Sequence, residues 1–240
     1  MLGECGRMPL SVLYLTRCIK YWLKILNMET ERYPYRCYLM LKRLAEQRTI
    51  NTINWAFKIR ELLFRFGFGH AWFNQGVGNT GIFLTQFTQR VKDCSLQLWN
   101  ADVLSSPKLK TYCTFKSTLE QELYLSSVFL TKYKTAMSRF RCSAHNLEIE
   151  RGRHEGIPVN ERLCKYCIER SMFYIEDEYH FICICSQYSN FREELLPIII
   201  WVHPTREKFV SLMKSKNIRI LNQLAAYIYH AMECRNRDGN

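Results

Sequence analysis

Apolar side chains recur every three to four positions along most of the chain, a spacing typical of helices with one buried face. The clearest segments are residues 10–26, 33–48, 55–66, 83–99 and 218–233. Residues 117–141 are expected to form one long helix, because Ser117 and Glu120 have the spacing of a capping box ahead of an apolar stripe. The fold class expected is therefore mainly α.

Basic side chains cluster on two of these predicted helices. In residues 10–26 they are three or four positions apart, so they share one face. In residues 117–141 they fall in the C-terminal half, where cations suit both the helix dipole and a phosphate backbone. A solvated helix face explains either set alone, but their repetition favours nucleic-acid binding. The candidate contacts are Arg17, Lys20, Lys24, Lys132, Lys134, Arg139 and Arg141.

A pattern of metal ligands interrupts the helices between residues 156 and 185. Cys164 and Cys167 form a C-x2-C pair, and twelve residues later His180 and Cys185 form H-x4-C. Zinc takes four Cys or His ligands at tetrahedral corners, and a closed set of four protein ligands indicates a structural role. Cys183, at H-x2-C, is an alternative fourth ligand, although the spacing of knuckle-type sites favours Cys185.

The residues around these ligands are β-prone and aromatic, which predicts a short β-hairpin within the zinc knuckle. They are Tyr166, Tyr174, Ile175, Phe181 and Ile182. The cysteine pair could also consist of core thiols or a redox pair. A redox pair should open a helix after a strand, and that context is missing.

Four segments follow from these patterns. Residues 1–104 form a basic helical region, and residues 105–156 hold the long helix and a connector. Residues 157–190 form the CCHC zinc knuckle, and residues 191–240 form C-terminal helices. The expected architecture is a helical array that carries a small zinc knuckle.

The motifs MSRFRCSAHNLEIERGR (137–153), ERLCKYC, IEDEYHFICIC and SQYSNFREELL resemble the C-terminal region of non-LTR (LINE-type) retrotransposon polyproteins, downstream of the reverse transcriptase. The upstream run GRMPLSVLYLTRCIKYWLKIL is similar to the segment just beyond the polymerase palm of these elements. One departure is Asp177, which stands where the family often has a glutamate. The resemblance implies that Cys164, Cys167, His180 and Cys185 bind zinc. It also implies that the region grips template RNA and target DNA, with the polymerase part of the parent polyprotein as a further partner.

Composition and charge agree with a polyanionic partner. The 240 residues are 48% hydrophobic and 14% aromatic, which excludes a wholly disordered chain. Lys and Arg number 34 against 22 Asp and Glu, giving a net charge of +12. The excess lies at the N-terminal end, where residues 1–60 hold 11 basic against 4 acidic side chains, whereas residues 158–240 hold 11 against 10. Phosphate contact is therefore expected along the helices rather than at the metal.

The cysteines and the first apolar segment indicate the cellular compartment of the protein. Eleven cysteines without a secretory signal peptide indicate a reducing compartment, so the chain is expected to be intracellular, nuclear or cytoplasmic. Arg17, Lys20 and Lys24 interrupt the apolar residues 9–26, which excludes a membrane span there. No membrane partner is expected.

Catalytic motifs are missing from the sequence. A reverse transcriptase needs carboxylates that hold two Mg²⁺ ions, and this chain has four aspartates with no adjacent pair. The acidic run 176–178 is expected to be a solvated edge beside the zinc site. Gly76, Gly78 and Gly81 spell G-x-G-x-x-G, but no strand precedes them, so they predict a turn between two helices.

The function predicted is a non-catalytic, nucleic-acid-binding accessory region of a retrotransposon-derived protein that contacts RNA or DNA. The alternative is a structural or protein-interaction remnant of such a polyprotein. In that case apolar surface that once packed on the polymerase would be exposed.

Overall fold

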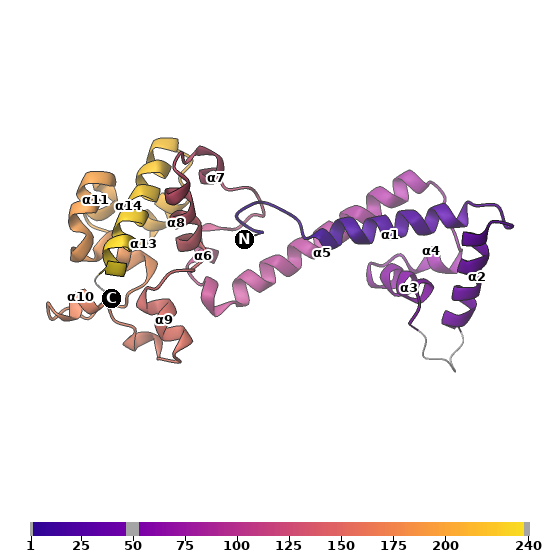
Figure 1. The fold of residues 1–240 in the computed structure, drawn as a ribbon, viewed down its shortest axis with the longest axis horizontal. Coiled ribbons are helices and arrows are strands. Elements are labelled where there is room, and N and C mark those ends of the chain that lie inside the picture. Colours follow the sequence, from indigo (N-terminus) through magenta and orange to yellow (C-terminus); the bar gives the residue numbers. More distant parts are fainter. Residues whose placement is uncertain (1, 47–52, 238–240) are drawn as a thin grey trace. The chain divides into compact units, whose positions relative to one another are not determined.

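The computed structural model describes residues 2–46 and 53–237, and it is mainly helical, as the apolar pattern predicts (Figure 1). Its contacts divide the chain into two compact units. The N-terminal unit is Met8–Trp99, and the C-terminal unit combines Met1–Arg7 with Asn100–Asn240. The metal-ligand segment 157–190 and the residues on either side of it therefore belong to one unit.

The N-terminal unit is built from helices joined by short turns. Its helices are α1 (Leu10–Leu26), α2 (Tyr33–Glu46), α3 (Trp55–Arg65), α4 (Gly69–Phe73) and the part of α5 (Thr80–Ser105) up to Trp99. The predicted ends of the first and third helices agree with the structure to within one residue. Residues 47 and 48, predicted to end the second helix, lie outside the described residues. Gly76 and Gly78 lie between α4 and α5, as the predicted turn requires, whereas Gly81 belongs to the first turn of α5.

Aromatic side chains form the centre of this unit. Trp22 and Trp72 are buried and stack with their ring centroids 6.5 Å apart. The Trp22 indole N–H donates to the Tyr38 hydroxyl at 3.0 Å, and this hydroxyl donates to Oε1 of Gln75 at 2.6 Å. The polar atoms of Trp22 and Tyr38 are thus satisfied, and the buried rings serve core packing rather than base stacking.

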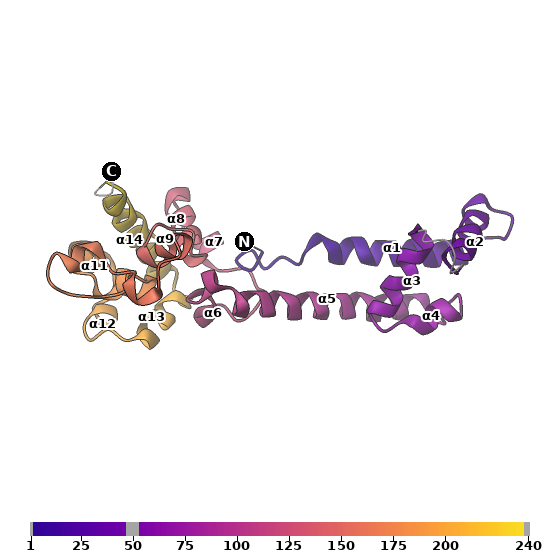
Figure 2. The ribbon, with the colours of Figure 1, turned by 90° about the horizontal axis from the view of Figure 1, so that it is seen from below.

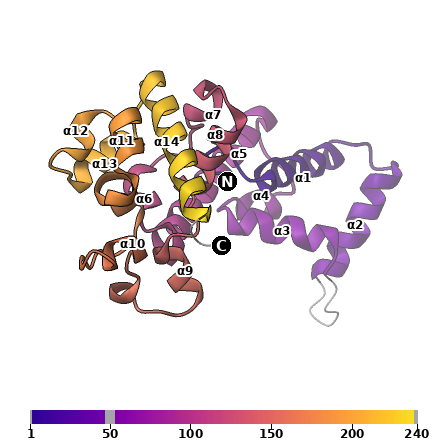
Figure 3. The same ribbon diagram turned by 60° about the vertical axis from the view of Figure 1, so that its left-hand side comes forward.

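The helices of the N-terminal unit pack around this core. α1 runs alongside α5 (Figure 2), where the Thr88 hydroxyl lies 3.5 Å from that of Thr16. α2 and α3 are neighbours and both contact α1 (Figure 3). The α1 face that carries Arg17, Lys20 and Lys24 remains exposed.

The C-terminal unit consists of short helical segments around one long helix. These are η1 (Pro107–Leu109), α6 (Tyr112–Phe115), α7 (Tyr124–Ser127), α8 (Thr131–Arg141), α9 (Glu148–His154), η2 (Val159–Glu161), α10 (Lys165–Ile168), η3 (His180–Ile184), η4 (Ser186–Tyr188), α11 (Ser189–Leu195), α12 (Ile198–Trp201), α13 (Arg206–Met213) and α14 (Ile218–Arg237). α14 packs against α7, α8 and α11 (Figure 1). Its buried face includes Leu224, Ile228 and Ala231, which form the centre of the unit.

The prediction of one helix over 117–141 is wrong. Residues 116–123 are not helical, and helix resumes only in α7 and α8. The Lys116 ammonium donates to the Glu120 carbonyl at 2.6 Å, and the Glu122 N–H donates to the Glu4 carbonyl at 2.9 Å. Cys5 forms an antiparallel bridge with Gln121. Pairing with this N-terminal strap (residues 2–7) therefore replaces the capping box.

The predicted β-hairpin is reduced to one antiparallel bridge, flanked by hydrogen bonds from the Cys164 N–H to the Tyr174 carbonyl at 2.8 Å and from the Glu176 N–H to the Arg162 carbonyl at 2.9 Å. Between 157 and 190, the described residues show a single isolated antiparallel bridge, from Leu163 to Ile175. Tyr166 lies in α10, while Phe181 and Ile182 lie in the π-helical turn η3.

In the described part of the chain, no helix combines the length and apolar character needed to cross a membrane.

Candidate metal centre

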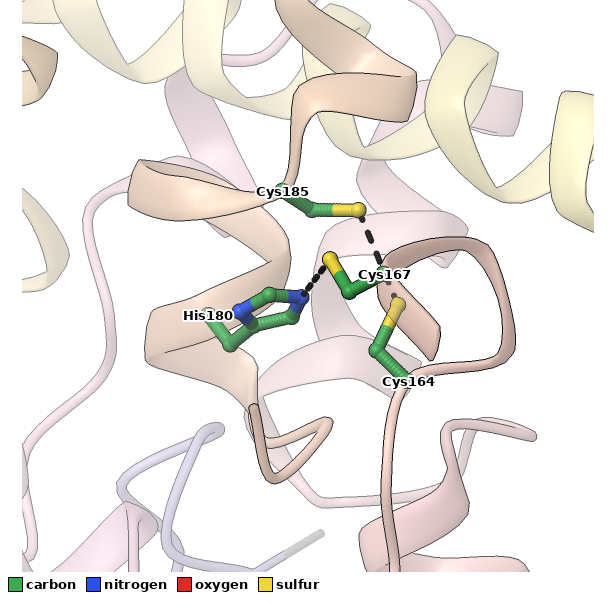
Figure 4. A group of neighbouring side chains, drawn as sticks. All are labelled: Cys164, Cys167, His180 and Cys185. Atoms are coloured by element: carbon green, nitrogen blue, oxygen red, sulfur yellow. Dashed lines mark hydrogen bonds between the residues drawn. The ribbon is translucent and has the colours of Figure 1, made fainter. Parts of the chain in front are cut away.

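Four side chains converge between α10 and η3 (Figure 4). Cys164 precedes α10 and Cys167 lies within it, while His180 begins η3 and Cys185 follows its last residue. All four residues are buried, and their ligand atoms lie within 4.8 Å of one another. The C-x2-C and H-x4-C pairs, twelve residues apart in sequence, thus form one cluster that can hold a metal ion.

Two pairs of ligand atoms have the spacing of a tetrahedral metal site. Sγ of Cys164 lies 3.8 Å from Sγ of Cys185, and Sγ of Cys167 lies 3.5 Å from Nε2 of His180. With Zn–S bonds of about 2.3 Å and Zn–N bonds of about 2.0 Å, tetrahedral angles place two sulfurs about 3.8 Å apart and a sulfur and a nitrogen about 3.5 Å apart. The arrangement therefore fits the ion without movement of these two pairs.

Cys183, the alternative ligand, is buried outside the cluster. Burial raises the pKa of its thiol to about 12, which keeps the thiol protonated and inert. Because η3 is a π-helical turn, its C-terminal end brings Cys185 rather than Cys183 to the other three ligands.

Mutual hydrogen bonding sets the charge state of the thiols. The hydrogen bond from Cys185 lowers the pKa of Cys164, and the same contact raises the pKa of Cys185. Burial, with the neighbouring Cys164, raises the pKa of Cys167 to about 11. Metal binding needs the thiolates, so an ion bound here would displace the protons held by Cys167 and Cys185.

Hydrogen bonds from two helices hold the loop that carries the last ligands. The Arg192 guanidinium in α11 donates to the Ile182 carbonyl at 2.7 Å and to the Cys185 carbonyl at 2.6 Å. The Tyr227 hydroxyl in α14 donates to the Phe181 carbonyl at 2.7 Å. The backbone around the ligands is therefore fixed by the helical core, which is how surrounding groups orient metal ligands.

Asp177 fixes the backbone of His180, and Tyr174 fixes its imidazole ring. Oδ1 of Asp177 accepts a hydrogen bond from its backbone N–H at 2.7 Å, and the Tyr174 ring stacks on the imidazole with centroids 5.4 Å apart. Nδ1 is buried and has no hydrogen-bond partner among the described residues. Nε2, which faces Cys167, is thus the nitrogen placed to bind an ion (Figure 4).

The acidic run 176–178 is not the solvated edge that the sequence predicts, because Glu176 and Glu178 are buried. Oε1 of Glu176 pairs with Nη1 of Arg235 at 2.7 Å, and Oε2 accepts the Glu148 N–H at 2.8 Å. Burial raises the pKa of Glu176, while the guanidinium of Arg235 opposes that shift. Each oxygen thus has a donor from a distant helix.

Glu178 connects the same segment to two other parts of the chain, Thr111 before α6 and residues 143–145 between α8 and α9. Its Oε2 accepts the Thr111 hydroxyl at 2.7 Å, and its Oε1 lies 2.9 Å from the Ser143 hydroxyl and 3.1 Å from Nε2 of His145. Burial alone would raise the pKa of Glu178, but the hydrogen bond and charge of His145 outweigh it, so the pKa is lowered. The residues that precede His180 therefore act as a clamp between the metal segment and the helices.

The predicted nucleic-acid contacts divide into two groups. Those whose side chains reach the surface are Arg17, Lys20, Lys24, Lys132, Lys134 and Arg139, of which Lys134 is half-buried. Among the described residues, none of the six forms an ion pair with a carboxylate. They lie in both units, on α1 and on α8.

Arg141 is not a surface contact, so its prediction as a phosphate ligand is wrong. Its side chain is 1% exposed; Nε pairs with Oε2 of Glu4 at 2.7 Å and Nη2 with Oε2 of Glu122 at 2.9 Å. Nη1 donates to the Met213 carbonyl at 2.7 Å. With every nitrogen of the guanidinium engaged, this arginine anchors the N-terminal strap.

Sequence reasoning missed Arg192 and Arg235, which hold the metal segment in place. A signal for Arg235 exists, because it follows Leu224, Ile228 and Ala231 at helical spacing and so continues the buried stripe of α14. A cation on an apolar stripe indicates a buried acidic partner, which here is Glu176.

No protein-family model, curated protein or solved structure matches the chain.

Proposed function

We propose that the protein is a non-catalytic nucleic-acid-binding module of retrotransposon origin that carries one structural zinc ion. The zinc assignment is supported by four buried Cys and His ligands, of which the pairs Cys164–Cys185 and Cys167–His180 have tetrahedral spacing. A site closed by four protein ligands has no open position for a substrate, so zinc holds the segment 157–190 together. None of the eleven cysteines forms a disulfide, which supports a reducing, intracellular setting.

The observation that carries nucleic-acid binding is a groove between α8 and α14. It encloses about 740 Å³, and Lys132 and Arg139 line it together with Tyr229. The Lys132 ammonium lies 4.8 Å from the centroid of the Tyr229 ring. Glu233 also lines the groove but forms an ion pair with neither cation. Two cations beside the half-buried ring of Tyr229 suit a phosphate backbone with an unstacked base.

A second basic face supports the same proposal. Arg17, Lys20 and Lys24 project from one side of α1 in the N-terminal unit, and all three are exposed. Each unit thus presents its own cations to a polyanion. We propose that RNA or DNA binds through its backbone, with the family resemblance favouring strands handled during retrotransposition.

A salt titration with single-stranded RNA and duplex DNA tests this function in the full, zinc-loaded chain. The logarithm of the association constant should fall linearly with the logarithm of salt, because each neutralised phosphate releases counterions. The double variant Lys132→Gln/Arg139→Gln should reduce this slope by about 1 to 2. The control Lys214→Gln/Lys216→Gln removes two exposed cations from the same unit and should leave the slope unchanged. Absence of binding to both nucleic acids at low salt would overturn the proposal.

Exposed apolar side chains favour protein interaction as a second candidate function. Phe129, ahead of α8, is 85% exposed, and Ile198 and Ile199 in α12 are 66% and 64% exposed. A single exposed apolar residue such as Phe129 is common, but the adjacent Ile198 and Ile199 can form a contact patch. Light scattering on the purified chain separates the two functions: a stable oligomer that binds no RNA supports this one, whereas a monomer that binds RNA supports the first.

A further inference from the structure

A second cavity in the C-terminal unit adjoins the metal segment. It encloses about 340 Å³ between η1, α9 and α13. Its wall includes Asp177, which caps the backbone of His180. Five basic side chains and three carboxylates line it, so the cavity has a formal surplus of positive charge.

The three carboxylates are already engaged. Glu150 pairs with Arg153 at 2.9 Å, and Asp177 pairs with Arg206 at 2.9 Å. Glu178 is held by the hydroxyl and imidazole donors described above. The acidic groups are therefore satisfied by partners inside the fold, and two of the five cations are neutralised with them.

Three cations remain at the cavity. They are Lys108, Lys110 and Arg162, and no carboxylate of the described residues lies within ion-pair distance of them. Arg162 is nevertheless held in place, because Nε donates to the Ile157 carbonyl and Nη1 to the Ile149 carbonyl, both at 2.9 Å. Since both acceptors are neutral, the full charge of the guanidinium is available to an anion. Nη2 takes part in neither of these two bonds, so its N–H groups can donate to a bound anion.

A glycine makes this placement of Arg162 possible. Gly152 is buried within α9, and a Cβ at this position would lie 2.7 Å from Cγ of Arg162. Glycine is less favourable than alanine inside a helix. Its presence here is explained by the close approach of the arginine side chain, which lies across α9 and reaches the cavity.

Apolar side chains complete the wall. Val159 and Ile175 line the cavity and are 44% and 36% exposed, and the buried Phe209 lines it as well. The cavity is at the small end of the range for ligand sites, about 300–1,000 Å³. Three cations beside an apolar surface suit a ligand with one phosphate group and one flat ring.

We propose that this cavity binds a nucleoside monophosphate unit, with its phosphate held by Lys108, Lys110 and Arg162 and its base on the apolar wall. The unit is either a free mononucleotide or the terminal nucleotide of a strand, since both present the same chemistry. The site goes beyond the extended backbone contacts proposed for α1 and α8. A mononucleotide tests it without engaging those contacts.

Calorimetric titration of the full chain with AMP, adenosine and inorganic phosphate tests the site at low salt. AMP should bind more tightly than either fragment, because it alone combines the phosphate with the base. Lys108→Gln/Lys110→Gln should weaken AMP binding by about tenfold or more, since two charge-assisted contacts are lost. Lys214→Gln/Lys216→Gln, which removes the same charge elsewhere in this unit, should leave AMP binding within about twofold of the wild-type value.

A variant that keeps every charge tests whether the position of the Arg162 guanidinium matters for binding. Gly152→Ala should weaken AMP binding by displacing Arg162, with zinc content unchanged; if this variant does not fold, the lysine pair still decides the test. Equal binding of AMP and adenosine would overturn the proposal, as would equal losses in both lysine pairs. Competition by a 5′-phosphorylated oligonucleotide, but not by its unphosphorylated form, assigns the site to strand ends. Without such competition the ligand is the free nucleotide. AMP binding and the salt dependence of RNA binding are read out separately, so either proposal can fail alone.

Discussion

Nη1 of Arg235 lies 2.7 Å from Oε1 of Glu176, and this buried ion pair joins the last turns of α14 to the residues that precede His180. Nη2 of the same arginine reaches the Asn146 carbonyl at 3.1 Å and Oε1 of Glu148 at 3.3 Å. One side chain thus connects the metal segment, the start of α9 and the central helix. The metal centre is therefore part of the helical unit and is not an appendage to it.

Replacing Arg235 with methionine should lower the free energy of unfolding by about 3–5 kcal/mol, because it leaves Glu176 buried without its cation. Urea unfolding followed by circular dichroism measures the change. Arg237→Met, two residues further along the same helix and exposed, is the control and should change the stability by less than about 0.5 kcal/mol. Similar values for the two variants would show that the Arg235–Glu176 pair does not join these elements.

Substituting one metal ligand should remove the zinc. Cys164→Ser and Cys185→Ser are each expected to reduce the metal content well below one zinc ion per chain. Cys183→Ser is expected to retain one, because its sulfur lies outside the cluster. Elemental analysis of protein purified without chelator gives the stoichiometry. Retention of zinc in Cys185→Ser together with its loss in Cys183→Ser would reverse the assignment.

A strong chelator should unfold the segment 157–190. Structural zinc contributes on the order of 10 kcal/mol of apparent binding energy at neutral pH. Hydrogen exchange should therefore show loss of protection around η3, which helices α11 and α14 otherwise hold through Arg192 and Tyr227. A metal-free chain with unchanged protection would mean that these two contacts are sufficient without the ion.

Arg139 and Arg141 should respond in opposite ways to the same substitution. Arg141→Met should lower stability by about 3–5 kcal/mol, because it leaves Glu4 buried without its partner. Arg139→Met should leave stability within about 0.5 kcal/mol but weaken RNA binding. Unfolding curves and RNA titrations on both variants separate the roles, and an Arg141→Met variant with native stability and impaired RNA binding would contradict the burial described here.

Gly6→Ala should destabilise the C-terminal unit. Gly6 has a φ of +60°, and a Cβ there would lie 2.3 Å from the backbone nitrogen of Gln121, so the N-terminal strap would have to shift. The matched control is Gly156→Ala, which has a φ of +74° but open space around the new methyl group. The control should cost about 1 kcal/mol for backbone strain alone, and Gly6→Ala clearly more, by urea unfolding. Equal costs would show that residues 2–7 do not pack tightly.

The metal ligands could be predicted from sequence because their spacing is local. Cys164 and Cys167 are brought together by a single turn, and H-x4-C by one short helical segment, so the ligand set needed no knowledge of the rest of the fold. The choice of Cys185 over Cys183 was predicted from spacing and agrees with the cluster. The longer helices α1, α2, α3, α5 and α14 were predicted for the same reason, since their apolar periodicity is local, whereas the short helices α4, α6, α9 and α10 were not.

The errors come from contacts between residues far apart in the sequence. Residues 116–123 have a helical apolar pattern, but the strap formed by residues 2–7 pairs with them and prevents the helix. Arg141 looked like a surface cation because Glu4, its partner, is 137 positions away. Glu176 and Glu178 looked solvated because their donors come from four other segments of the chain. Helical spacing can mark a buried cation such as Arg235, but it does not identify the distant residue that pairs with it.

The N-terminal strap determines how this chain can be divided and in what order it folds. Residues 2–7 belong to the same unit as residues 100–237, so the unit between them is an insertion within that unit rather than a preceding domain. During synthesis residues 8–99 can fold as soon as they emerge, whereas Glu4 has to wait for Arg141. A fragment that begins at residue 100 would therefore lack a buried counter-ion of its own core.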